Sequence, residues 1–194
     1  MTWIRRKPAD DPGSRISPSE VNIAARLLAT LGRPILIPGD GTTLGHLSFV
    51  RDQATALRKM MLNPRTFGQA YNLASTEFCS DEGYVDVLAD IVGVLPEKTF
   101  LPPEITDEAY ERMPYPLMQR HGVRLVDWRK NSVFSTRKFE EHVGYAQEHT
   151  FFAGMLETYE WFTRDGVQDR LEFDFSHEDA LIERMRQDGL RDRE

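Results

Sequence analysis

A short apolar stretch that runs through a glycine turn into a helix constrains the fold more than any other feature. The Ile35–Ile37 stretch is typical of a buried strand, and residues 38–41 (PGDG) follow it as a turn signal. A helix is then predicted from about Phe49 to Leu62, where Asn63 and a proline end it. A strand that leads through a turn into an amphipathic helix favours a mixed α/β fold.

The helix from Phe49 to Leu62 carries an apolar stripe, and this stripe predicts which side faces the core. Apolar residues at spacings of three and four lie on one helical face. The predicted core face consists of Val50, Ala54, Leu57 and Met61. The predicted solvent face consists of Arg51, Asp52, Arg58 and Lys59.

Further strands and helices alternate along the chain. Predicted strands are Thr2–Ile4, Gln69–Leu73 and Lys98–Leu101, with an extended segment at Ser132–Phe134. Predicted helices begin at the capping residues Ser17, Ser80, Ser135 and Ser176, and one more spans about Phe152 to Phe162 with an aromatic stripe facing the core. Prolines at 102, 103, 114 and 116 predict an irregular region with short helical pieces. The fold class is therefore α/β, or α+β in appearance, with few short strands and about six amphipathic helices.

The glycines at 39, 41 and 45 resemble a phosphate-binding loop, because they follow a strand and precede a helix. Their spacing, however, is not that of the G-x-G-x-x-G fingerprint. No acidic residue follows about 20 positions later to hold a ribose, since Lys59 and Met60 lie there. We therefore interpret the glycines as a tight turn that needs their backbone freedom, and we expect no cofactor-binding residues in this chain alone.

Composition excludes several classes of function. The 194 residues carry a net charge of -7, which gives no electrostatic support to nucleic-acid binding. Cys79 is the single cysteine, so no internal disulfide or cysteine zinc site can form, and a small core residue is its preferred role. No apolar run approaches the roughly 20 residues that cross a bilayer, and no signal peptide opens the chain, so a cytoplasmic location is expected.

Chemical motifs are sparse. His142 and His149 do not have metal-ligand spacing on one helical face, and no metal site is expected. His46 lies between the glycine turn and a helix, where a structural role and a ligand contact are both open. Thr43, His46 and Asn72 are the candidate substrate-binding residues if the chain keeps a pocket. No catalytic residue is assigned.

An ordered set of segments resembles the extended short-chain dehydrogenases/reductases (SDRs), the NAD-dependent epimerase/dehydratase family. Arg33–Ala54 is similar to the family's G-R-P-I-P-(I/L)-P-G-D-G turn and H-V-D-D-L-A helix. The other similar segments are Phe67–Ala74 (G-x-x-Y-N-V), Ser135–Tyr145 (S-x-K…L-G-Y), Gly154–Trp161 (G-L-x-x-T-x-x-W), and Thr2–Arg5 with Pro12-Gly13 (T-x-L-R-P…G-P-G). The likeness spans residues 2 to 175 and implies the C-terminal, substrate-binding half of such an enzyme, with an incomplete Rossmann sheet.

The departures from the family pattern concern its chemistry. The family's cofactor loop and its Tyr-x-x-x-Lys pair, which transfers protons, have no counterpart here. The residues four positions after the six tyrosines are Ser75, Leu88, Pro114, Gln119, His149 and Thr163, none of them lysine. Gly45 stands near the position where sugar-nucleotide members carry an arginine that grips the diphosphate.

The resemblance leads to three hypotheses. The first is a substrate-binding lobe over residues 1–175 with a C-terminal helix and charged tail over 176–194, without redox activity alone and completed by a partner chain that supplies the Rossmann half and NAD(P). The second is a non-catalytic interaction or scaffold protein, whose uncovered apolar face seeks a partner or another copy. The third is a repurposed enzyme that uses the retained pocket for a small molecule.

Overall fold

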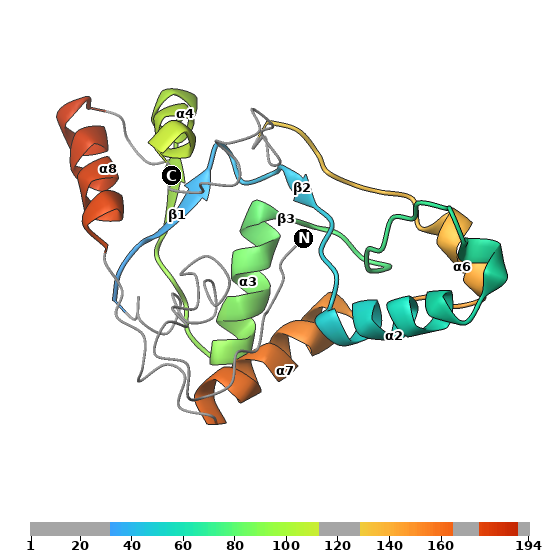
Figure 1. Ribbon diagram of the computed structural model, residues 1–194. Coiled ribbons are helices and arrows are strands. Elements are labelled where there is room, and N and C mark those ends of the chain that lie inside the picture. Colours follow the sequence, from blue (N-terminus) through green and yellow to red (C-terminus); the bar gives the residue numbers. More distant parts are fainter. Residues whose placement is uncertain (1–31, 113–128, 165–174, 190–194) are drawn as a thin grey trace, which may run out of the picture. The chain divides into compact units, whose positions relative to one another are not determined.

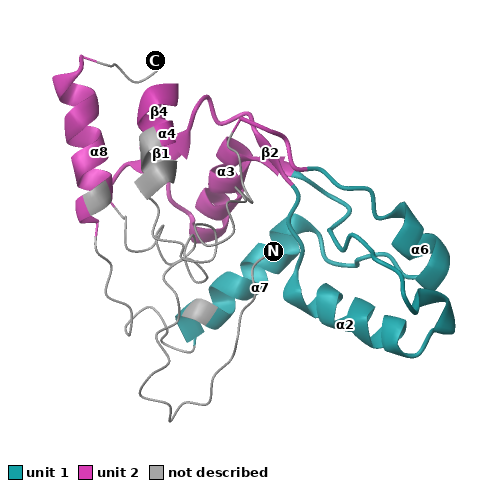
Figure 2. Ribbon diagram, turned by 45° about the horizontal axis from the view of Figure 1, so that its top comes forward, with its two compact units in different colours: residues 1–26, 46–78, 133–171 teal, residues 27–45, 79–132, 172–194 magenta. Residues whose placement is uncertain are grey.

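The computed structural model describes residues 32–112, 129–164 and 175–189, and divides the chain into two compact units (Figures 1 and 2). Within these residues lie six α-helices and four short strands, which confirms the mixed α/β class. The predicted strand at Thr2–Ile4, the helix that begins at Ser17 and the prolines at 114 and 116 lie outside the described residues. No helix in the described ranges combines the length and the apolar character that a membrane span requires.

The unit drawn in magenta in Figure 2 is organised by a parallel strand pair. Strand β1 (Ile35–Pro38) pairs with β4 (Lys98–Leu101), with Ile37 opposite Phe100. Strands β2 (Leu44–Gly45) and β3 (Cys79–Ser80) form a short antiparallel pair. Parallel neighbours require a crossover, and helix α3 (Asp81–Val92) lies in the chain between the two longer strands. Both longer strands fall where the sequence predicts them.

Helix α3 begins at the capping residue that the sequence predicts. The hydroxyl of Ser80 accepts a hydrogen bond from the Gly83 amide at 3.0 Å, which satisfies one of the free amides of the first turn. Gly93 ends the helix in the left-handed conformation, with φ of 75°. Val85 and Leu88 are buried, as the apolar spacing indicates.

The proline-rich region after β4 is more regular than predicted. Helix α4 (Pro103–Arg112) begins there, because a proline fits the first helical position, where its missing amide costs nothing. Its Ile105 packs in a buried cluster with Leu101 of β4 and with two residues of helix α8 (Ser176–Gln187), Leu181 and Met185. Prolines therefore start this helix instead of interrupting it.

The predicted strand at Gln69–Leu73 is wrong. Residues 69–75 belong to no strand or helix, although β-formers favour an extended backbone there. A strand needs a neighbouring backbone to complete its ladder, and Asn72 instead donates from its side-chain amide to the Ser135 carbonyl at 3.3 Å. The Tyr71 hydroxyl bonds Nδ1 of His142 at 2.8 Å. Side chains hold this segment in place.

The unit drawn in teal in Figure 2 consists of helices and connecting loops in its described part. Its helices are α2 (Val50–Met61), the 3-10 turn η1 (Pro64–Thr66), α6 (Arg137–Val143) and α7 (Phe151–Arg164). Their core joins Ala56, Phe139 and Tyr145, with Tyr71 and Leu73 packed against it. The three helices lie where predicted, although Thr136 and not Ser135 is the N-cap of α6. The aromatic stripe of α7 is incompletely buried, since Phe152 is exposed.

Helix α2 buries a different face from the predicted one. Asp52, predicted to face solvent, is 2% exposed, and Ala56 is fully buried beside Phe139. The predicted core residues Val50, Leu57 and Met61 are exposed. The apolar stripe exists as predicted, but it faces solvent and not the core. The hydrogen-bond partners of Asp52 decide which side of the helix is buried.

Asp52 connects α2 to the segment that leads into α7. Its carboxylate accepts hydrogen bonds from the Tyr145 hydroxyl at 3.2 Å, the His149 amide at 3.0 Å and His149 Nδ1 at 2.9 Å. Burial raises the pKa of Asp52, but the hydrogen bonds and charge of His149 outweigh this effect, so the pKa is lowered from its ordinary value. Burial and the Asp52 charge raise the pKa of Tyr145 to about 12. The three residues therefore form a network in which a neutral phenol and a histidine hold a carboxylate.

Candidate functional site: a hollow beside His46

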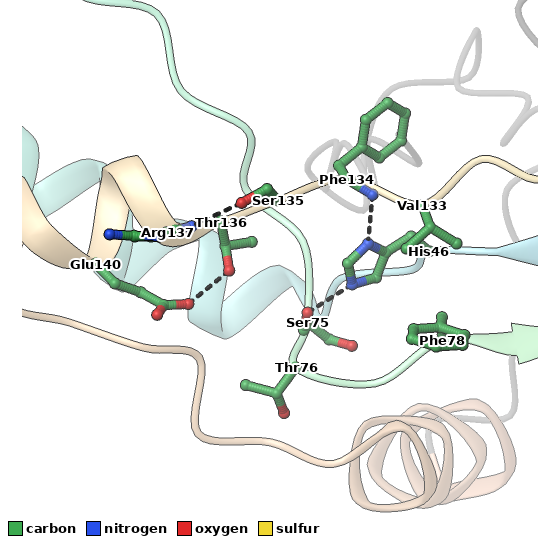
Figure 3. A pocket seen from close by; sticks show the side chains of 10 residues that line it. All are labelled: His46, Ser75, Thr76, Phe78, Val133, Phe134, Ser135, Thr136, Arg137 and Glu140. Carbon is green, nitrogen blue, oxygen red and sulfur yellow. Dashed lines mark hydrogen bonds between the residues drawn. The ribbon is translucent and has the colours of Figure 1, made fainter.

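A hollow of about 330 Å³ lies within the unit that contains α2, α6 and α7 (Figure 3). Two chain segments far apart in sequence form its walls, one before β3 and one that leads into α6, and His46 lies between them. Its lining residues are His46, Ser75, Thr76, Phe78, Val133, Phe134, Ser135, Thr136, Arg137 and Glu140.

His46 joins the two walls of the hollow. Its Nδ1 accepts a hydrogen bond from the Phe134 amide at 3.0 Å, and its Nε2 lies 2.6 Å from the Ser75 carbonyl oxygen. An amide can only donate and a carbonyl can only accept, so the proton belongs on Nε2 and the ring is neutral in this arrangement. Both ring nitrogens are used by the protein itself. A ligand in the hollow would therefore contact the ring carbons of His46, and the histidine acts as a positioning residue.

Two aromatic rings pack beside His46 in the hollow. The Phe134 ring lies parallel to the imidazole, with centroids 6.4 Å apart, and Phe78 meets it edge-on at 6.2 Å. Both phenylalanines are about half exposed, as is Val133. Exposed rings beside a hollow offer flat apolar faces to a ligand.

The polar groups of the lining come mainly from the start of α6. The Thr136 hydroxyl donates to Glu140 at 2.5 Å, and Nε of Arg137 donates to Glu141 at 2.6 Å. The Ser75 hydroxyl donates to the Glu77 carbonyl at 2.6 Å, so its proton is occupied. The hollow thus presents hydroxyls and one cation balanced by carboxylates. Among the described residues, no group of three potential ligands could hold a metal ion.

The structure brings together two of the three sequence-predicted residues. His46 lines the hollow, and Asn72 bonds the carbonyl of its lining residue Ser135. Thr43 belongs to the other compact unit, where its carbonyl accepts from the Asp81 amide at 3.0 Å. The site is therefore described without Thr43, and the role of all three residues in binding stays a prediction.

Of the ten lining residues, sequence reasoning named only His46 as a site candidate, and Phe78 and Phe134 are the largest of those it missed. Phe78 lies outside any helix or strand. Phe134 was used only to predict the extended segment Ser132–Phe134. Large apolar residues in a loop have no periodic partner, and this isolation is the signal that could have found them.

Two of the three glycines read as a tight turn have the role expected of them, whereas Gly45 lies in β2 and does not adopt positive φ. Gly39 and Gly41 adopt positive φ, at 58° and 74°. The carboxylate of Asp40 accepts from both the amide and the hydroxyl of Thr42, at 3.1 and 2.6 Å. The carboxylate of Asp40 places a negative charge beside the turn, which opposes an approaching phosphate.

Cys79 is poorly suited to nucleophilic chemistry. Burial, with a smaller contribution from the Asp81 charge, raises the pKa of its thiol to about 11. The thiolate is the reactive form, and it is scarce at neutral pH when the pKa is this high. The half-buried thiol therefore remains a packing group of β3.

We expect the substitution His46→Ala to loosen the wall formed by residues 133–136. The Phe134 amide loses its acceptor, so its hydrogen exchange should accelerate by about tenfold, equivalent to roughly 1.4 kcal/mol for a lost hydrogen bond. Amide exchange followed by NMR measures this effect. The Gly93 amide, which bonds the Ala89 carbonyl at 2.8 Å at the end of α3, is the internal control. Unchanged exchange at Phe134 would contradict the positioning role of His46.

Comparisons with known proteins agree with this fold. No protein-family model and no curated protein matches the chain. Solved structures do match it. UDP-glucuronic acid 4-epimerase from Bacillus cereus in complex with NAD is 17% identical, with a TM-score of 0.56 over 76% of this chain and 40% of that one. dTDP-glucose 4,6-dehydratase from Bacillus anthracis is 14% identical, with a TM-score of 0.56 over 78% of this chain and 41% of that one. An epimerase from Methanothermobacter thermautotrophicus is 20% identical, with a TM-score of 0.57 over 75% of this chain and 38% of that one.

The chain shares its fold with part of these enzymes. At 14–20% identity, the likeness concerns the fold alone. The chain spans about two fifths of the length of the enzymes it matches. The likeness thus supports the mixed α/β fold that the sequence resemblance implies.

Proposed function

We propose that this chain is a small-molecule-binding lobe of the extended SDR type, which acts together with a Rossmann-type polypeptide that binds NAD(P). The carrying observation is the extent of the structural likeness, which covers three quarters of this chain and two fifths of each enzyme. In the resemblance read from the sequence, that portion corresponds to the substrate-binding half. The lobe would span residues 1–175, with 176–194 as an added helix and tail.

The hollow beside His46 supports the choice of ligand class. Its half-exposed Phe78 and Phe134 rings offer flat faces, and the hydroxyls of Thr76 and Thr136 lie at its edge. This combination suits a small hydroxyl-bearing ring. A diphosphate is disfavoured in the hollow, since Arg137 is the only lysine or arginine of the lining and already donates to Glu141. The proposed ligand is therefore a sugar-like molecule held without a strong diphosphate grip.

Calorimetric titration of the purified chain tests whether it binds the small molecule and leaves NAD(P) binding to the partner polypeptide. NAD, NADP and their reduced forms should give no saturable binding at micromolar concentration, while glucose, glucuronate or UDP-glucuronic acid should bind weakly. The bound ligand should shift the NMR signals of Thr76 and Thr136, and Phe134→Ala should weaken the binding. Micromolar binding of NAD by this chain alone would refute the lobe-only function. Failure of the whole ligand panel to shift those signals would refute the proposed use of the hollow.

A further inference from the structure

Helix α2 exposes an apolar seam that nothing in the described structure covers. Val50 and Leu57 are 42% and 44% exposed, Met61 is 77% exposed, and Ala54 is exposed between them. These side chains are separated by four, three and four positions, so they repeat every seven residues as the a and d positions of a coiled coil do. We call Val50, Ala54, Leu57 and Met61 the α2 seam.

The α2 seam is distinct from the side of the helix that builds the core. Asp52 and Ala56, four positions apart, face the buried cluster, and Met60 continues this line. At about 100° per residue, this line lies on a different side from the seam. The helix is thus already anchored by one face and presents a second apolar face outward.

The charges beside the seam indicate what could cover it. Arg51 and Arg58, seven positions apart, lie along one flank, at the positions that set partner choice in coiled coils. Arg51 bonds Glu157 at 2.8 Å but remains 68% exposed, and Arg58 forms no ion pair within the described ranges. The helix has no exposed acidic residue, because its single carboxylate is the buried Asp52. The flank is therefore basic, in a chain whose net charge is -7.

These charges select one occupant over another. Two copies of the chain that paired antiparallel through this seam would place Arg51 and Arg58 against the same arginines, and like charges at such positions oppose pairing. A parallel pair would place them against Gln53 and Met60, which offer no carboxylate. An acidic flank on the partner would instead meet them favourably. We propose that the α2 seam binds an amphipathic helix of another protein, with apolar residues at heptad spacing and Glu or Asp beside them. This surface is independent of the hollow and of any cofactor.

Two fluorescein-labelled synthetic peptides of about 18 residues, held helical by a side-chain staple, provide the probes. Both carry leucines at the a and d positions, and one has glutamates and the other lysines at the flanking positions. In fluorescence anisotropy with the full chain, the acidic peptide should bind about tenfold more tightly than the basic one, and added salt should reduce the difference.

Matched variants locate the binding site. Leu57→Glu should abolish binding of the acidic peptide, while Leu95→Glu, at a residue 98% exposed outside α2, should leave it unchanged. Because Leu57 is already partly in solvent, its variant should keep the helical circular dichroism of the parent chain. Arg58→Glu should reverse the preference toward the basic peptide.

Three results would overturn the proposal. The first is equal affinity for the two peptides, which would leave the basic flank without a role. The second is binding that Leu57→Glu does not change while the variant stays folded. The third is a dimer in sedimentation velocity that Leu57→Glu dissociates, which would make a second copy of the chain the occupant.

Discussion

Asp52→Ala should lower the free energy of unfolding by about 3 kcal/mol, because it leaves the buried Tyr145 hydroxyl and the partly buried His149 without their acceptor. The Tyr145 hydroxyl, the His149 amide and His149 Nδ1 all donate to this carboxylate, which is almost completely removed from solvent. The substitution also separates α2 from the segment that leads into α7. Urea unfolding followed by circular dichroism measures the change. Asp52→Asn, which keeps one acceptor oxygen, should lose about half as much.

Two controls isolate this effect. Asp90→Ala removes an exposed aspartate from the surface of α3 and should change the free energy of unfolding by less than about 0.5 kcal/mol. The pH dependence supplies the second. The pKa of Asp52 is lower in the folded chain than in the unfolded chain, so its contribution is present above about pH 4 and is lost as the pH falls through the folded-state pKa. The difference between parent and Asp52→Asn should therefore shrink below about pH 4. A difference that grows in acid would contradict the charged network.

Gly41→Ala should lower the free energy of unfolding of the unit that contains β1 and β4 by about 3 kcal/mol. The loss combines backbone strain with crowding by neighbouring side chains. Gly41 has φ of 74°, which an alanine adopts only with strain. A methyl group there would lie 3.0 Å from Cγ2 of Ile37, from Cε1 of Phe100 and from Cβ of Glu82. The turn is closed by bonds from its own amide to the Pro38 carbonyl and from the Glu82 amide to its carbonyl, so the backbone cannot move away freely. Thermal or urea unfolding measures the loss.

Gly93 provides a matched control for the same substitution. Its φ of 75° equals that of Gly41 within a degree, but a methyl group there would meet no atom within 4 Å. Gly93→Ala should therefore cost only the backbone term, about 1 kcal/mol. The difference between the two variants measures the crowding around Gly41. Equal losses would show that the turn relaxes and that Ile37 and Phe100 do not enclose it.

Local signals predicted most of the helices and the two longer strands. The start of α3 at Ser80 was predicted because capping depends on residues within one turn. Strand β1 and the turn after it were predicted for the same reason, since proline fixes its own φ and glycine permits positive φ wherever they occur. The strand predicted at Gln69–Leu73 failed, because strand formation requires a second backbone that no local pattern specifies.

The hollow could be predicted in part. His46 and Asn72 were candidates because polar residues after a turn or in a family-like segment can meet a ligand. Their partners Phe134 and Ser135 lie 88 and 63 positions away, and a single sequence carries no signal for contacts at that distance. Both ring nitrogens of His46 bond backbone groups, which makes His46 a positioning residue. These bonds too are visible only in the tertiary structure.

The sequence by itself determined where α2 begins and ends and that the helix carries an apolar stripe, because both depend on neighbours within a few positions. It could not determine which face of α2 is buried. Tertiary structure decided that, by bringing the Tyr145 hydroxyl and the His149 amide to Asp52 from 93 and 97 positions away. A carboxylate enters a core when enough donors meet it there, and the stripe of Val50, Leu57 and Met61 then remains at the surface.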